Sequence, residues 1–513
     1  MKHIALLSLS LLLSTSLATA QDIFCMADFA AQDLSGTARY VGMGGAMSAL
    51  GADMSTMSTN PAGTALYRKS DVAVTASVVS QNDGHKYDGK GTTHGSFDQI
   101  GLVYVTQIGH RSSRFFNFGF NYHKQKDFNR LINTSHDYNA TDGPSQTWQM
   151  ADLASYWGSP LAATPLTYMG YCGYLLGNDL SCYNAGSHHY DQAQWGSIQA
   201  YDFNLSTNLD DRLYFGLTLG VLNVDYNSTS LYGESLYTAD GTYDGLYNLT
   251  NDIDISGYGL NFRFGAIIRP IADSPFRFGL SISTPTYYDL KYRSNAYLKS
   301  SLGADESETY NQSTATRYDY NIHTPWTFNL SLGHTLNFGR QSALAIGAEY
   351  EYADYSTCEQ SYGDGWDDGW DDWYDEDVEL NHQADHWLKS VHTFRLGVEF
   401  MPIPQLAIRA GYNHITSPVD QDAYANQFID SRTIDYSTST AYYLPSATNR
   451  FTFGLGFNCE GFYFDATCKI QSQHADFYAF NTQAGNDHAV NECPRKRINL
   501  GNTQVLFTLG YRF

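Results

Sequence analysis

The segment 363–377 holds the densest run of residues that could bind a metal, with aspartates and one glutamate set among glycines and tryptophans. Calcium prefers carboxylate oxygens, but the run lacks the spacing and the closing glutamate of an EF-hand loop. Two alternatives stay open, namely loose contact with divalent ions at the cell surface and a mobile acidic loop. His188 and His189 form a pair without a third ligand nearby in the sequence. We therefore predict no metal site and no cofactor.

The remaining motifs with chemical meaning do not amount to a catalytic site. The glycine-rich run 42–51 has neither a preceding strand nor a following helix of the kind that a phosphate-binding loop requires. No Gly-x-Ser-x-Gly elbow is present, so we assign no catalytic residue. The net charge of −23 argues against a nucleic-acid partner. The sequence predicts a protein that is not an enzyme.

The C-terminal segment 504–513 shows which kind of element dominates the chain. Its large apolar residues occupy alternate positions, and the positions between them hold mostly polar or small residues. This is the apolar-out, polar-in alternation that a bilayer demands of a strand, although a soluble sandwich strand can alternate in the same way. In a membrane barrel the following residues would face lipid: Val505, Phe507, Leu509, Tyr511 and Phe513.

The N-terminal segment supports the barrel. Lys2 and His3 precede an apolar run that closes at Ala20, so residues 1–20 are predicted to be a cleaved secretory signal. Beyond them no run of about 20 apolar residues occurs, which excludes a helical membrane span. A membrane protein of this sequence must then be a closed barrel. The 40 tyrosines and 44 glycines suit the interfaces and the packed lumen of such a barrel.

Alternating segments bounded by turn residues predict about fourteen strands between residues 71 and 513. Short turns alternate with long connections, as the periplasmic turns and external loops of outer-membrane barrels do. We therefore predict an all-β fold, a 14-stranded antiparallel transmembrane β-barrel over 71–513. The expected long external loops are 125–194, 227–252, 293–316, 357–386, 416–446 and 474–498.

Residues 21–70 precede the first expected strand and are rich in small side chains. Close packing against a barrel wall favours such residues, so this segment is predicted to fold as a hatch inside the lumen. Seven cysteines are an odd number for an exported protein. Cys172 and Cys182 fall in one predicted external loop and are the expected disulfide.

Several motifs resemble the FadL/TodX family of outer-membrane transporters for hydrophobic compounds, including its Bacteroidetes-like members. The run 38–46 followed by Asn60-Pro61-Ala62 resembles the N-terminal hatch of that family, in which Asn-Pro-Ala is the hallmark. Further likeness continues through 284–290, 324–326 and 394–400. The departures are concentrated in the loops, where family members bind ligands.

The resemblance implies a channel of a Gram-negative outer membrane that takes up fatty-acid-like hydrophobic or amphipathic molecules. External loops capture the ligand, a lumen site beside the hatch receives it, and a gap at a kinked third strand releases it sideways. Gly119 in that strand is the expected weak point, because glycine weakens a ladder, although it could equally make room for a hatch side chain. The expected capture residues are Tyr156, Trp157, Leu161, Leu166, Tyr168, Met169 and Tyr171, with a lid over the barrel mouth as the alternative.

The expected partners are a hydrophobic small molecule, outer-membrane lipid and lipopolysaccharide, and the expected state is a monomer. Two other functions stay open at this point. A non-transporting barrel of the same family would serve as a shuttle or assembly partner for secreted proteins, and it would have a fully plugged lumen. A general porin would lack a hatch of about fifty residues.

Overall fold

The structure is a computed structural model, and it describes residues 22–108, 114–161, 164–271, 274–339, 341–363, 374–431, 434, 437–481 and 493–513. The predicted signal segment 1–20 and most of the acidic run 363–377 lie outside the described residues. Within the described ranges, no helix is long and apolar enough to cross a membrane.

The strands close into an antiparallel barrel, because β1 (Asp71–Gln81) pairs with both β2 (Thr93–Gln107) and β22 (Asn502–Arg512). The predicted 14-strand barrel is confirmed in the described part of the chain. We call each of the fourteen strand positions of the barrel wall a stave. Three staves are interrupted, so each comprises two strands: β3 (Phe115–Asp127) with β4 (Arg130–Asp137), β8 (Arg277–Ser283) with β9 (Tyr287–Leu302), and β10 (Glu308–His323) with β11 (Thr327–Phe338). The other staves are β5 (Asn184–Leu209), β6 (Leu213–Tyr237), β7 (Tyr243–Ile268), β12 (Ser342–Asp354), β15 (Ser390–Ile403), β16 (Leu406–Ile415), β18 (Thr448–Cys459) and β19 (Phe462–Ser472).

Shorter elements lie within the lumen or at its external end. The helices are α1 (Ile23–Ala30), α2 (Ala38–Gly42), α3 (Gln146–Tyr156), α4 (Pro165–Cys172) and α5 (Val378–Trp387), with single turns of 3₁₀ type at η1 (Met54–Ser58), η2 (Pro61–Leu66) and η3 (Tyr355–Thr357). Two short strands extend the wall, β13 (Glu359–Gly363) and β14 (Tyr374–Glu376). A separate sheet comprises β17 (Tyr442–Pro445), β20 (His474–Tyr478) and β21 (Lys496–Asn499).

The outer surface carries an apolar band, and β6 shows where that band ends. Its outward positions run from Leu213 through Leu217 to Val221, whereas the next outward positions are Asn223, Asp225 and Asn227. Eight residues of strand span about 26 Å, or about 20 Å along the membrane normal at the usual tilt. The part of β6 beyond Val221 therefore stands outside the hydrocarbon layer.

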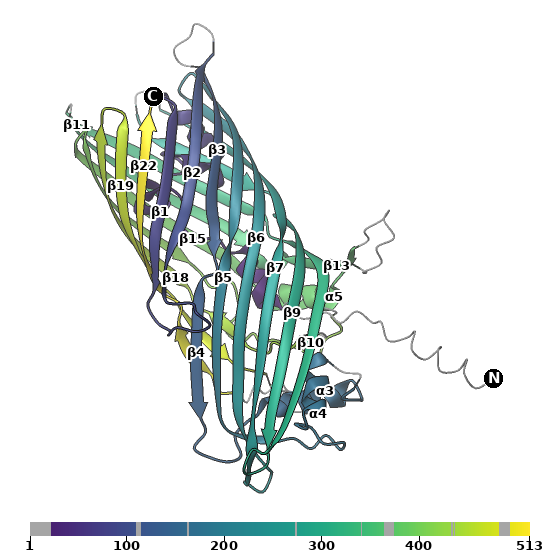
Figure 1. Ribbon diagram of the computed structural model, residues 1–513. Coiled ribbons are helices and arrows are strands. Elements are labelled where there is room, and N and C mark those ends of the chain that lie inside the picture. The colour runs from purple at the N-terminus through teal and green to yellow at the C-terminus, as the bar shows by residue number, and fades with distance from the viewer. Residues whose placement is uncertain are drawn as a thin grey trace.

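The barrel wall continues far beyond this band on one side. Figure 1 shows β5, β6, β7, β9 and β10 running together past the other staves toward the lower end of the picture. The expectation of loops over 227–252 and 293–316 is therefore wrong, since β6 and β7 pair as far as Tyr237 and Tyr243, and β9 and β10 pair from His323 to Glu308. Outside the membrane the outward side chains are mostly polar, so these strands lack the lipid-facing pattern by which the others were predicted.

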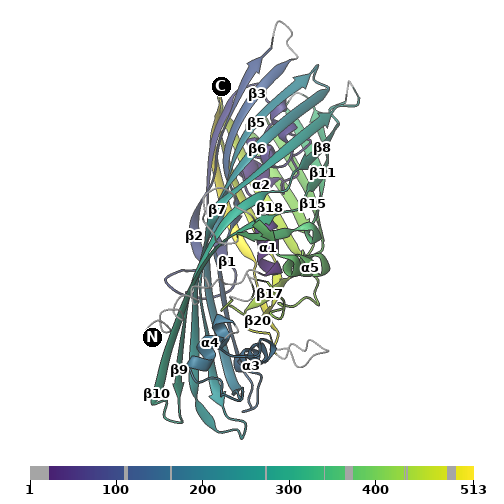
Figure 2. The same ribbon diagram turned by 90° about the vertical axis from the view of Figure 1, so that its right-hand side faces the viewer.

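Helices and the small sheet cover the inner face of this extended wall (Figure 2). Leu298 of β9 packs in one buried cluster with α3, α4 and β20. The cluster contains Met150, Leu166, Met169, Leu236, Leu249 and Phe477. Residues 125–194, predicted as one long loop, thus contain β4, two helices and the start of β5. We call this external assembly of α3, α4 and the β17–β20–β21 sheet the platform.

A buried carboxylate holds the platform to the wall. Glu234 of β6 accepts hydrogen bonds from the Ser145 hydroxyl, from the Gln146 backbone N–H at 3.1 Å and from the Tyr232 hydroxyl at 2.6 Å. These donors include the N-cap residue and the first backbone N–H of α3, where a negative charge is favoured. Burial nevertheless raises the pKa of Glu234 to about 7, because it forms no ion pair with any described residue that would offset the loss of hydration.

The segment 22–70, for which we keep the name hatch, lies against the barrel wall and bonds to it. Arg39 of α2 forms an ion pair with Glu399 of β15 at 2.8 Å, and the Ala38 N–H donates to Thr508 of β22 at 2.7 Å. Wall glycines leave room for its backbone: a methyl group on Gly397 would overlap the Met43 carbonyl oxygen. The small residues of both partners therefore permit backbone-to-backbone packing.

Candidate functional site: two chambers divided by a hatch helix

Two neighbouring cavities lie within the lumen, and α1 forms part of the wall of both. The outer chamber faces the platform and has a volume of about 140 Å³. The inner chamber lies between α1 and the barrel staves and has a volume of about 210 Å³. Phe24, Asp28 and Phe29 of α1 border both chambers. A molecule moving inward from the platform would therefore meet α1 between the chambers.

The outer chamber is mainly apolar and aromatic. Ring contacts organise it: Phe29 packs against Phe128 with centroids 5.6 Å apart, and Phe128 meets Tyr226 edge-on at 5.0 Å. Such contacts hold the rings in place around the cavity. Its apolar lining is Phe24, Phe29, Phe128, Tyr226, Ile253, Ile255, Tyr292, Ile434 and Phe477.

The inner chamber is lined largely by charged and amide side chains. Most of the charges are paired: Arg263 with Asp202 at 3.1 Å, and Arg395 with Glu351 at 3.0 Å. Paired buried charges are tolerated because each partner replaces the lost water of the other. The polar lining includes Asp98, Lys124, Gln125, Lys126, Asp127, Gln194, Arg263, Arg395, Arg450, Lys469 and Gln504.

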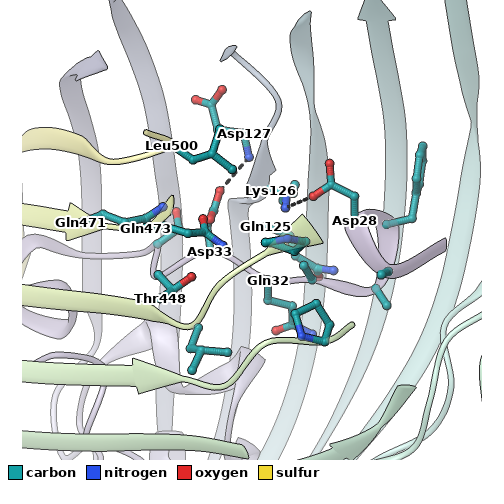
Figure 3. Close-up of a pocket in the computed structure, with 18 of the residues that line it drawn as sticks. Asp28, Gln32, Asp33, Gln125, Lys126, Asp127, Thr448, Gln471, Gln473 and Leu500 are labelled. Carbon is teal, nitrogen blue, oxygen red and sulfur yellow. Dashed lines mark hydrogen bonds and ion pairs between the residues drawn. The ribbon is translucent and has the colours of Figure 1, made fainter. Parts of the chain in front are cut away.

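Ion pairs fix α1 and the chain after it in this position (Figure 3). Asp28 on α1 accepts from Lys126 at 2.7 Å and from the Tyr443 hydroxyl at 3.3 Å. Downstream of the helix, Asp33 accepts from the Asp127 N–H at 3.0 Å and from Arg450 at 3.2 Å. These contacts hold α1 and the residues after it to β3, β17 and β18. The helix therefore separates the chambers with its aromatic side chains, and its polar contacts fix it in place.

The Asn60-Pro61-Ala62 motif lies at the other end of the hatch, where η2 begins. The Asn60 side chain caps η2 by accepting from the Ala62 N–H at 3.1 Å, and its amide donates to the Ala266 carbonyl of β7 at 3.4 Å. Pro61 occupies the first helical position, where its missing N–H costs nothing. Gly216 of β6 lies directly against Pro61. The motif is a rigid turn held against the wall, and it lines neither chamber.

Gly119 is not a gap in the wall. The pairing of β3 continues through it on both sides, with Val103 of β2 opposite on one edge and Asn204 of β5 on the other. A methyl group at Gly119 would overlap the end of the Met57 side chain of η1. The expectation of a lateral exit at Gly119 is therefore corrected, and the alternative of room for a hatch side chain holds.

A break in the wall instead lies further along the same two strands. Pairing of β2 with β3 stops at Gln99 opposite His123, so residues 93–98 and 124–127 face each other without a ladder. Each strand carries a bulge there, at Asp98 and at Gln125. Side chains bridge the break, with Lys124 donating to Ser96 at 2.7 Å and His94 lying 3.3 Å from Asp127. We call residues 93–98 and 124–127 the seam, and both segments border the inner chamber.

The predicted capture residues do not come together at either chamber. Leu166 and Met169 are fully buried in the platform core, whereas Tyr156, Leu161 and Tyr168 are exposed on its surface. Trp157 and Tyr171 are half-buried. The set is thus divided between packing and an exposed surface, because α4 buries Leu166 and Met169 on one face and exposes Tyr168 on another.

The predicted Cys172–Cys182 bridge is also corrected, since both are free thiols. The Cys172 thiol interacts with Tyr168 and the Cys182 thiol with Thr147, so the two point to different neighbours. In the described ranges no group of three or more His, Cys, Asp or Glu residues is placed to hold a metal.

The sequence prediction missed α1 and the seam. The run 23–30 is short, and its only distinguishing signal is an aspartate, Asp28, set among apolar residues. The signal for the seam is the polar cluster at the start of β2 and at the end of β3, which interrupts the outward apolar pattern. Neither sequence pattern identifies a functional site by itself, because only the folded structure brings these segments together.

Comparison with solved structures gives matches over most of the chain. The Pseudomonas putida toluene transporter TodX is 13% identical, with 94% of this chain and 99% of that chain covered and a TM-score of 0.48. The Ralstonia pickettii toluene transporter TbuX is 13% identical, with 94% and 99% covered and a TM-score of 0.49. No family model and no curated protein matches the chain. A Pseudomonas aeruginosa FadL homologue is similar at 12% identity, with 94% and 99% covered and a TM-score of 0.49.

Proposed function

We propose that the protein is an outer-membrane channel for hydrophobic or amphipathic small molecules. The observation that carries the proposal is the pair of chambers divided by α1, the first apolar and the second polar. Apolar molecules leave water readily for an aromatic cavity, at about 25 cal/mol per Å² of surface buried. An open aqueous pore offers no such binding, and a shuttle barrel with a fully plugged lumen would lack the chambers.

The proposed route begins at the platform and passes through the outer chamber. From there α1 must shift to admit the ligand to the inner chamber, which requires the contacts of Asp28 with Lys126 and of Asp33 with Arg450 to loosen. We propose that the ligand then leaves sideways through the seam into the membrane. The seam suits this role because side chains close it, and side chains rearrange far more readily than a backbone ladder.

A charge placed in the outer chamber tests the proposal. Ile255→Asp puts a carboxylate among aromatic rings, whereas Ser256→Asp changes the next residue of β7, which faces outward. Loss of one buried side chain contact of about 1.5–3 kcal/mol weakens binding roughly tenfold or more. We expect Ile255→Asp to reduce binding of a fluorescent fatty-acid analogue by that factor, with Ser256→Asp close to the unmodified protein. Equal binding by both variants would reject the outer chamber as the site.

A further inference from the structure

The inner chamber contains a buried cation and a buried carboxylate that are not paired with each other. Lys469 of β19 is 5% exposed, and its ammonium donates to the Leu34 carbonyl at 3.1 Å. Among the described residues, no carboxylate oxygen lies within ion-pair distance of it. Asp98 of β2 is 2% exposed, and its Oδ2 atom has no hydrogen-bond partner in the described structure.

The two groups face the same part of the chamber. Lys469 lies opposite Gln504 in the β19–β22 pairing, and the Gln504 amide reaches across β1 to Ser77 at 2.8 Å and to Asp98 Oδ1 at 3.3 Å. Asp98 has Lys124 and Lys469 as electrostatic neighbours, and Lys469 has Asp33, Asp98 and Asp127. The Ser96 hydroxyl also donates to Asp98 Oδ1, at 2.7 Å, and the Ser77 hydroxyl, which accepts from Gln504, lies beside the same carboxylate. Lys469 and Asp98 therefore stand on either side of a glutamine amide.

The backbone is shaped to turn Asp98 inward. A bulge in β2 opposite Thr75 and Ala76 makes two successive residues, Asp98 and Gln99, point into the lumen, where a regular strand would alternate. Bulges commonly re-aim a side chain beside a functional site. Without the extra residue, a buried carboxylate that forms no direct ion pair would not arise here, and such a group is costly unless something binds it.

We propose that the inner chamber binds the head of a zwitterionic amphiphile, with its anionic group on Lys469 and its ammonium on Asp98. This inference deepens the proposed function, on which it rests, by naming the ligand class. The apolar part of the ligand would extend past α1 toward the outer chamber. A plain hydrocarbon would leave both charges unsatisfied, and a simple carboxylic acid would satisfy Lys469 alone.

The test compares amphiphiles that share one tail: decane, decanoic acid, decylamine and α-aminodecanoic acid. Binding to the full chain in lipid nanodiscs is measured by calorimetry near neutral pH. Because a hydrogen bond to a charged group contributes roughly a tenfold change or more, we expect α-aminodecanoic acid to bind at least about tenfold more tightly than decanoic acid. Asp98→Asn should remove that advantage and leave decanoic acid binding unchanged. Lys469→Met should weaken the binding of both decanoic acid and α-aminodecanoic acid.

Asp225→Asn is the control. Asp225 lies on the outward face of β6 and borders neither chamber, so the change removes the same charge away from the ligand. It should keep the preference for the zwitterion. Retention of that preference by Asp98→Asn, or equal binding of all probes including decane, would overturn the head-group inference and leave the channel intact. Failure of every probe to bind would count against the channel itself. Correct folding of each variant is confirmed by heat-dependent migration on gels.

Discussion

At the scale of single residues, glycines decide how closely the hatch approaches the wall. Gly119 shows this most directly, because a side chain there would occupy the space of Met57. Gly119→Ala should therefore overpack the contact and lower the free energy of unfolding by about 1–3 kcal/mol. The measurement is urea unfolding of the barrel in lipid vesicles.

A second variant tests whether the cost of Gly119→Ala comes from packing against Met57 or from a weak point in the wall. Met57→Ala leaves a cavity and destabilises on its own, but it also makes room for a methyl group at position 119. The double variant should cost clearly less than the sum of the single ones, since residues in contact are coupled. Simple additivity would show that Met57 and Gly119 do not share this space.

At the scale of elements, the seam is the place where β2 and β3 separate. Its two segments border the inner chamber on one side, and the aromatic pair Phe97 and Tyr122, with ring centroids 5.6 Å apart, stands at its lipid edge. A ligand that leaves sideways must pass these residues. A photoactivatable fatty-acid analogue should therefore label peptides from 93–98 and 122–127 during uptake.

The labelling experiment has two internal references. The outward face of β16, over 406–415, contacts lipid without bordering the seam and should be labelled only at the background level. Ile255→Asp, which disturbs the outer chamber, should reduce labelling at the seam and leave the background unchanged. Equal labelling around the whole barrel would show partition into lipid in place of directed release.

The elements that the sequence predicts well are those in contact with lipid. There the alternation of Phe262 and Phe264 with Arg263 has a strong physical cause, because an outward arginine would be very costly. Outside the membrane that penalty disappears, so the same staves carry Asp252 and Asp254 on their outer face and look like loops. The packing of residues 22–70 against the wall agrees with their small side chains. The chambers could not be predicted, because they depend on contacts such as Asp28 with Lys126 that join distant segments.

At the scale of the whole molecule, the outward pattern of β6 defines where the membrane lies. Leu217 sits within the apolar band, and Asn227 lies on the same face of the same strand beyond its edge. Ten residues of strand separate them, about 33 Å along the stave. The extended wall and the platform would then project from the cell surface, with the outer chamber above the hydrocarbon layer.

Paired lysine substitutions test this placement, because lysine on a lipid face costs about 2–4 kcal/mol at the bilayer midplane and about 0–1 kcal/mol near the interface. Leu217→Lys should therefore lower the free energy of unfolding in lipid vesicles by the larger amount. Asn227→Lys should be nearly neutral, since it faces water and has Asp225 beside it. Changing to lipids with longer acyl chains should raise the cost at positions near the band edge, such as Val221→Lys, before it affects Asn227. A large cost at Asn227 in ordinary bilayers would mean that the extended wall is itself immersed in lipid, and the ligand would then enter the outer chamber from the membrane.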